Sequence, residues 1–245
     1  MRPQTVLFDL DDTLVHCNIY FEMVIEQFAD ELVTWFASDK LTADEVKKKQ
    51  LEIDTARVAV QGFMPDHFPQ SLIDTYHYFS SLTGRKTSKL EEKSLRELGK
   101  SVYEKQVEPY PHMVETLDLL KGEGHSLFLY TGGVATVQER KIKALGLESY
   151  FGDRVFIRRH KTTDALEDIL KSHRFERELT WMVGNSIRTD IVPALETGIH
   201  AIHVPAILEW QYNIVDIHVQ PKGAFLKVPT LREVPSAIAG YGGSF

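Results

Sequence analysis

Short apolar runs alternate with helical patterns at the start of the chain and again from Gly124 onward. The runs are almost continuously apolar and rich in β-branched or aromatic residues, which is typical of strands covered on both faces of a parallel sheet. Strands are therefore expected at residues 5–8, 126–130, 155–157, 180–183 and 201–204. Helices are expected between them, at residues 113–121, 134–145, 163–171 and 189–197. This alternation predicts an α/β fold with a doubly wound (Rossmann-like), mostly parallel sheet.

Residues 16–108 follow another pattern, in which apolar side chains recur at helical spacing and no strand is evident. One helix is expected through residues 20–35, and the capping-box spacing of Thr42 and Glu45 predicts the start of a second helix. Two further helices are expected, one through residues 68–76 and one through residues 95–107. The chain thus divides into two domains. Residues 16–108 form an inserted all-helical domain, and residues 1–15 and 109–245 form a discontinuous α/β core. The glycine-rich end, residues 240–244, is expected to fray.

The composition narrows the range of partners. Lys and Arg number 28 against 35 Asp and Glu, a formal net charge of −7, and no basic face is evident, so a nucleic-acid partner is not expected. The single cysteine, Cys17, excludes an intrachain disulfide and a multi-cysteine zinc site. No apolar run approaches the roughly 18 residues of a membrane span. We expect a cytoplasmic protein with no membrane partner.

Three carboxylates, Asp9, Asp11 and Asp12, stand where the first apolar run ends. The carboxyl ends of parallel strands form the edge at which open α/β sheets bind ligands. Crowded carboxylates cost free energy unless a cation or a proton compensates them, so this cluster points to a functional site. In an extended segment Asp9 and Asp11 would point the same way. The alternative is a solvated turn whose acids cap the next helix.

Four separated motifs resemble the haloacid dehalogenase superfamily, and within it the aspartate-dependent phosphatases. The first is Asp-Leu-Asp-Asp-Thr-Leu at residues 9–14, which matches the Asp-x-Asp-x-Thr-Leu signature of that family. The others follow in the family's order: Thr131 at the end of an apolar strand, Lys161 ahead of a helix, and a strand leading into Gly184 and Asn185 with Asp190 further on. The resemblance spans residues 5–204, and the first and last motifs are its specific parts.

The resemblance implies a two-step hydrolysis of a phosphate ester. Asp9 would attack the phosphorus atom and form an aspartyl-phosphate. Asp11 would protonate the departing alkoxide and then deprotonate the attacking water. The Thr131 hydroxyl and the Gly132 amide would hold phosphate oxygens, and Lys161 would neutralise the phosphoryl charge.

The same resemblance implies Mg²⁺ as the cofactor. Its ligands would be the Asp9 carboxylate, the main-chain carbonyl of Asp11 and the side chain of Asn185. Asp190 would complete the metal site by orienting bound water and Lys161. Asn185 departs from the family, which usually has an acid at this position. An amide oxygen remains a suitable ligand, although the site then carries one negative charge less.

The interval between Asp9 and Thr131, about 120 residues, is far longer than one crossover connection requires. By resemblance, the helical insertion in this interval is a cap of the family's α-helical type. A lid over the sheet edge would exclude bulk water and leave room only for small molecules. We therefore expect a small phosphorylated metabolite as the substrate, and a monomer or a homodimer.

Three other functions remain open. In a 2-haloacid dehalogenase, Asp9 would attack a carbon atom, and the reaction would need neither Mg²⁺ nor an acid at Asp11. A phosphosugar mutase would pass phosphate from Asp9 to a bound sugar. A non-catalytic binding module would retain the fold alone, and Asn185 gives this alternative some support. No zinc site is expected at His200 and His203, because no third ligand stands at a suitable spacing.

Overall fold

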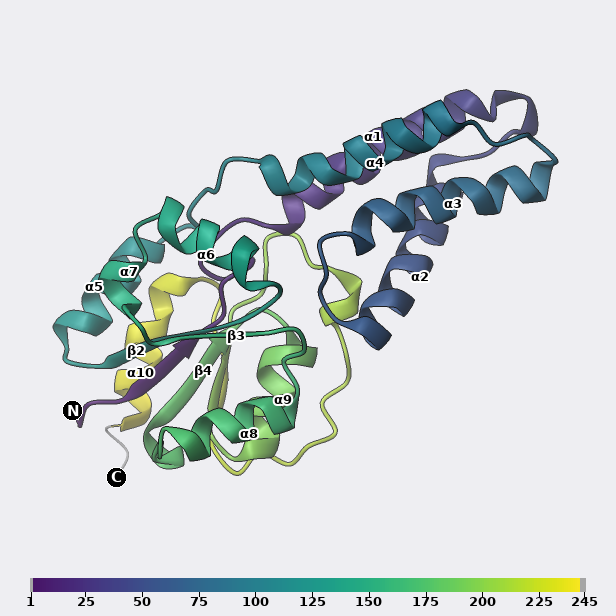
Figure 1. The fold of residues 1–245 in the computed structure, drawn as a ribbon. Coiled ribbons are helices and arrows are strands. Elements are labelled where there is room, and N and C mark those ends of the chain that lie inside the picture. The colour runs from purple at the N-terminus through teal and green to yellow at the C-terminus, as the bar shows by residue number, and fades with distance from the viewer. Residues whose placement is uncertain (1, 243–245) are drawn as a thin grey trace. The chain divides into compact units, whose positions relative to one another are not determined.

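The computed structural model describes residues 2–242, which form two compact units (Figure 1). One unit is built from both ends of the chain, up to Asn18 and from Val107 onward, and the other from Ile19–Gln106. No helix within residues 2–242 is both long enough and apolar enough to cross a membrane.

A six-stranded sheet forms the middle of the first unit. Its strands are β1 (Thr5–Phe8), β2 (Ser126–Gly132), β3 (Val155–Arg158), β4 (Thr180–Gly184), β5 (His200–His203) and β6 (Phe225–Lys227). They lie in the order β3-β2-β1-β4-β5-β6, and every neighbouring pair is parallel. The expected α/β fold with a parallel sheet is therefore confirmed, with β1 between β2 and β4.

The register of β1 places its carboxyl end beside the carboxyl-terminal halves of its neighbours, β2 and β4. Phe8, the last residue of β1, pairs with Leu129 of β2 and with Val183 of β4. Asp9 continues this alignment, since its amide N–H donates a hydrogen bond to the Val183 carbonyl oxygen over 2.9 Å. Residues that follow these strands therefore lie at one edge of the sheet.

Helices cover both faces of the sheet (Figure 1). They are α5 (Met113–Gly122), α6 (Ala135–Ala144), α7 (Glu148–Phe151), α8 (Thr163–Ser172), α9 (Val192–Thr197) and α10 (Val234–Gly242). Alternate residues of β1 enter opposite layers. Val6 and Phe8 pack in a hydrophobic cluster with residues of α5 and α10, whereas Leu7 packs in a cluster with residues of α8 and α9. Burial on both faces explains why the strands are continuously apolar.

Several details of this unit differ from the sequence expectation. β6 is not predicted, because this edge strand has only three residues and the first and last of them are exposed. The helix expected at residues 189–197 begins later, as α9, because a π-type turn at Ile187–Ile191 precedes it. The Ser186 hydroxyl starts this turn by accepting a hydrogen bond from the Thr189 amide. The glycine-rich end, expected to fray, is helical through Gly242, and residues 243 and 244 lie outside the described part of the chain.

Helices α1 to α4 build the second unit, and α1 starts at Asn18, where the N-terminal segment of the first unit ends. Their bounds are Asn18–Trp35, Ala43–Gln61, His67–Thr83 and Lys89–Ser101. Apolar side chains from all four helices pack into one cluster, and Thr42 and Glu45 form the expected capping box at the start of α2. The expectation that the fourth helix reaches Val107 is wrong. α4 ends at Ser101, and Val107 packs against the hydrophobic core of the first unit.

Candidate active site

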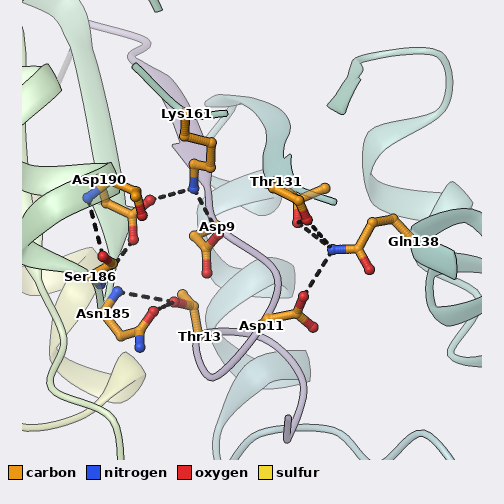
Figure 2. Close-up of polar contacts among 11 residues, drawn as sticks. Asp9, Asp11, Thr13, Thr131, Gln138, Lys161, Asn185, Ser186 and Asp190 are labelled. Carbon is orange, nitrogen blue, oxygen red and sulfur yellow. Dashed lines mark hydrogen bonds and ion pairs between the residues drawn. The ribbon is translucent and has the colours of Figure 1, made fainter. Parts of the chain in front are cut away.

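Residues distant in the sequence meet at the carboxyl edge of the sheet (Figure 2). Asp9 directly follows β1, and Asn185 directly follows β4. Thr131 lies near the end of β2, and Lys161 lies between β3 and α8. The chain brings these side chains together because the strands that carry them are parallel, so their carboxyl ends lie at the same edge of the sheet.

A buried ammonium group lies between two buried carboxylates. Lys161 Nζ is 2.7 Å from Asp9 Oδ1 and also donates to Asp190 Oδ1. Lys161 is 4% exposed, Asp9 6% and Asp190 1%. The second oxygen of Asp190 accepts a hydrogen bond from the Ser186 amide over 2.9 Å. Asp190 is thus fixed from two sides, and it holds Lys161 against Asp9.

Gly184, the last residue of β4, makes room for Asp190. A Cβ atom at this position would lie 2.3 Å from Asp190 Oδ2, which is far inside van der Waals contact. The glycine of the fourth motif therefore has a steric cause: only a residue without a side chain lets the Asp190 carboxylate approach the strand end.

Burial and neighbouring charges set the protonation of this cluster. Burial raises the pKa of Asp9 to about 7, and the charge of Asp190 adds to the effect, whereas Lys161 opposes it. Burial also disfavours the charged form of Lys161, but the charges of Asp190 and Asp9 outweigh it and raise the pKa of Lys161 above its ordinary value. Any further positive charge beside Asp9 would favour the ionised carboxylate, which is the form a nucleophile requires.

Asn185 is held by contacts of its main chain and of its side chain. Its main-chain N–H donates to Thr13 Oγ1 over 3.1 Å, and the Thr13 hydroxyl lies 3.4 Å from the side-chain oxygen, Asn185 Oδ1. The Asn185 carbonyl oxygen accepts a hydrogen bond from His203 Nε2 over 2.9 Å. In Figure 2 the Asp9 carboxylate lies between Lys161 and the Asn185–Thr13 pair. The sequence assigned Thr13 no role, although it belongs to the first motif.

Asp11 has other partners than Asp9. Its Oδ2 accepts a hydrogen bond from Gln138 Nε2 over 2.9 Å, and its Oδ1 accepts one from Lys141 Nζ over 2.5 Å. Both donors belong to α6. The sequence did not single them out, because polar residues on a mostly polar helix form no pattern. What could have identified them in the sequence is their position, because both lie in the first helix after Thr131.

The backbone explains why Asp11 does not share the partners of Asp9. The chain turns directly after Leu10, whose carbonyl oxygen accepts a hydrogen bond from the Leu14 amide over 2.8 Å. Asp12 adopts the left-handed conformation, with φ 58°, and its carboxylate accepts hydrogen bonds from the amides of Cys17 and Asn18. Asp12 therefore serves the turn that leads into α1.

The candidate metal ligands are oxygen atoms of several kinds. Within residues 2–242, no group of three or more His, Cys, Asp or Glu side chains is placed to bind a metal ion. His200 contacts the Glu178 carbonyl oxygen and the Ala224 amide, so both of its ring nitrogens serve the main chain. A metal site at the sheet edge would combine the Asp9 carboxylate with amide and main-chain oxygens. This donor set suits Mg²⁺, which binds hard oxygen ligands and keeps several waters.

Comparison with known proteins matches most of the chain to one family. Residues 3–198 match the family model of the haloacid dehalogenase-like hydrolases. A glyceraldehyde 3-phosphate phosphatase of Methanothermobacter thermautotrophicus is 27% identical over 216 residues, which cover 82% of this chain and 85% of the relative. A glyceraldehyde 3-phosphate phosphatase of Methanocaldococcus jannaschii is 25% identical over 203 residues, which cover 81% and 83%.

The fold also has counterparts among solved structures. The crystal structure of a haloacid dehalogenase-like family hydrolase from Xanthomonas campestris superposes with a TM-score of 0.78. The alignment covers 97% of this chain and 91% of that one, at 22% identity. At this identity the likeness concerns the fold.

Proposed function

This chain belongs to the haloacid dehalogenase-like hydrolases, and we propose that it hydrolyses small phosphomonoesters with Mg²⁺ through an aspartyl-phosphate on Asp9. The observation that carries the proposal is the buried Asp9 carboxylate at the end of the central strand, 2.7 Å from the Lys161 ammonium. A carboxylate in this place can attack phosphorus while the ammonium offsets the charge of the phosphoryl group.

The oxygen donors at the sheet edge fit Mg²⁺. We assign the Asp9 carboxylate, the main-chain carbonyl of Asp11 and the side-chain oxygen of Asn185 as its ligands. Asp190, fixed beside Lys161, would orient water on the ion. When bound, the ion offsets the negative charge of the phosphoryl group and favours the ionised form of Asp9.

The proposed reaction has two steps, and Asp11 acts in both. Asp9 forms a bond to phosphorus as the bond to the ester oxygen breaks, and Asp11 gives a proton to the departing alkoxide. Asp11 then takes a proton from water, which attacks the aspartyl-phosphate, releases inorganic phosphate and restores Asp9. The Thr131 hydroxyl and the Gly132 amide bind phosphate oxygens, and Lys161 stabilises the charge that develops on them.

The substrate in this proposal is a small phosphorylated metabolite. Two relatives are named for their action on glyceraldehyde 3-phosphate, which makes this compound the first to test. The helical domain, residues 16–108, is assigned as the cap that restricts the site to small molecules, because it is inserted between Asp9 and Thr131.

Phosphate release tests the proposal. The protein is assayed against a panel of phosphorylated metabolites, including glyceraldehyde 3-phosphate, with Mg²⁺ and with EDTA. We expect release that requires Mg²⁺ and is lost in Asp9→Asn, which removes the nucleophile while keeping its size. The variant's thermal unfolding, compared with the wild type, shows that its fold is intact.

Three outcomes would overturn the proposal. Halide release from 2-haloacids in EDTA would identify a dehalogenase. Phosphate transfer to a bound sugar without release would identify a mutase. Full activity in Asp9→Asn would exclude the aspartyl-phosphate.

A further inference from the structure

Gln138 is a buried polar side chain on a helix that is mostly exposed. Only Gln138 and Ile142 are buried in α6, and Gln138 is 1% exposed. Its Nε2 lies 2.7 Å from Thr131 Oγ1, 2.8 Å from the Gly132 carbonyl oxygen and 2.9 Å from Asp11 Oδ2. The Gln138 amide therefore joins the end of β2 to Asp11 (Figure 2).

Lys141 lies one turn further along α6, on the same face of the helix as Gln138. Its Nζ donates to Asp11 Oδ1, and its side chain is 14% exposed. Each oxygen of the Asp11 carboxylate thus has one donor from α6. In Figure 2 this carboxylate points toward Gln138, away from Lys161.

A group that transfers a proton must be held within hydrogen-bond reach of the reacting oxygen. Asp11 lies in the turn that begins at Leu10 and not in a strand, so the sheet does not orient its side chain. Hydrogen bonds to a carboxylate are among the strong ones, and two of them from one rigid helix restrict both rotatable bonds of the Asp11 side chain. The link from Gln138 to Thr131 also keeps Asp11 at a set distance from the hydroxyl assigned to the phosphate.

We propose that Gln138 and Lys141 are positioning residues, which hold the Asp11 carboxylate in place for proton transfer. The inference rests on the proposed function, because it takes Asp11 as the acid and base of the reaction. Neither residue belongs to the four motifs, and neither is assigned a contact with the substrate.

Leaving-group dependence tests this inference. Gln138→Leu and Lys141→Met remove the donor and leave an apolar side chain one atom shorter. Each should lower kcat/KM for glycerol 2-phosphate about tenfold more than for p-nitrophenyl phosphate, which is part of the roughly 10²–10⁴ that general acid catalysis supplies. Lys141→Arg, which retains a charged donor, should restore much of the ratio between the two substrates. The inference would be overturned if Gln138→Leu and Lys141→Met both kept the wild-type ratio of kcat/KM between the two substrates. It would also be overturned if either variant hydrolysed glycerol 2-phosphate faster than the wild type.

Two controls separate positioning from a general effect on the fold. Lys143→Met removes an exposed lysine from the same helix and should leave the ratio unchanged. In an Asp11→Asn background, Lys141→Met should cause no further change in the ratio, because its partner is already gone. A further drop there would show that Lys141 acts on another group, contrary to the inference.

The crystal structure of the double variant Gln138→Leu/Lys141→Met gives a readout independent of activity. We expect the Asp11 side chain to leave its position beside α6 while Asp9 keeps its contact with Lys161. An unmoved Asp11 would overturn the inference. If the wild type releases phosphate from no substrate, the proposed function fails, and this structure still decides whether α6 positions Asp11.

Discussion

Asp9 and Asp11 are two residues apart, yet their carboxylates have different surroundings. Asp9 is buried beside the Lys161 ammonium, and burial raises its pKa to about 7. Asp11 is bound by two donors of α6. Different surroundings allow neighbouring carboxylates to take different roles. This separation lets the two carboxylates take the two proposed roles, attack on phosphorus and proton transfer, provided that a cation beside Asp9 favours its ionised form.

Replacing the proposed acid and base should affect substrates unequally. Asp11→Asn should slow the hydrolysis of glycerol 2-phosphate by about 10²–10⁴. The loss for p-nitrophenyl phosphate should be much smaller, because p-nitrophenolate leaves with little need of a proton. The kcat/KM values of the two substrates give the comparison. Equal losses would contradict acid catalysis by Asp11.

Asn185 sets the charge of the proposed metal site. Asn185→Asp adds one negative charge beside Asp9, so we expect tighter Mg²⁺ binding, by about tenfold, which corresponds to about 1.4 kcal/mol. Asn185→Ala removes the side-chain oxygen and should weaken binding. Calorimetric titration with Mg²⁺ measures both effects without an assay of activity. Unchanged affinity in both variants would show that this side chain is not a ligand.

At the scale of elements, local patterns predicted most of the α/β unit. The apolar runs became strands because both faces of the sheet are covered, and the Thr42–Glu45 capping box starts α2 as expected. The errors fall where the local signal is weak. β6 pairs with β5 by main-chain hydrogen bonds and has little buried apolar surface. The Ser186 side chain starts a π-type turn in place of the first turn of the expected helix.

The packing of α2 leaves a carboxylate in an unfavourable place. Asp54 is 8% exposed, and within the described residues its Oδ1 has no hydrogen-bond partner. Burial raises the pKa of Asp54 from 3.8 to about 6, although Ser71 and Arg57 act in the opposite direction. The folded state therefore holds this proton more tightly than the unfolded chain. The stability that protonation provides is complete below pH 4 and is lost as the pH rises through 6.

Asp54→Asn should therefore stabilise the protein at neutral pH. We expect the free energy of unfolding at pH 7.5 to increase by about 1–3 kcal/mol, and the gain to shrink toward zero near pH 4. Urea unfolding at both pH values measures the effect. Asp30→Asn changes an exposed aspartate of α1 and serves as the control, with little change expected. A gain independent of pH would contradict the role assigned to burial of the charge.

At the scale of the whole molecule, the helical unit is an insertion, and the two segments of the first unit that flank it are hydrogen-bonded to each other. The chain leaves the first unit after Asn18 and returns to it at Val107. Close to both points, Val15 and Pro109 form an antiparallel bridge. The His16 amide donates to the Glu108 carbonyl oxygen over 3.0 Å. The hydrophobic clusters on the two faces of the sheet contain no residue of Ile19–Gln106. The first unit therefore has its own core and closes its own chain ends.

Removal of the insertion should leave the first unit folded. We expect a variant in which a short Gly-Ser linker replaces residues 19–106 to unfold cooperatively on heating, with a lower helix content in its circular dichroism spectrum. The linker needs to span only a short gap, because His16 and Glu108 are hydrogen-bonded. A non-cooperative transition would show that the sheet depends on the helical unit for its stability.

The sequence by itself determined the α/β class, the helical character of the insertion and the motifs of the family. These follow from hydrophobic periodicity and motif spacing, which are properties of short segments and need no knowledge of distant contacts. Sequence reasoning also named Asp9, Lys161 and Asp190, which the structure brings together.

Only the tertiary structure decided the partners of the remaining site residues. Whether Asp11 continues a strand or lies in a turn depends on the hydrogen bonds that the Leu10 carbonyl oxygen accepts. Gln138 and Lys141 resemble other polar residues of α6 in the sequence. They become partners of Asp11 because the helix packs with that face toward the end of β2, and the contacts that set this packing come from residues far apart in the chain.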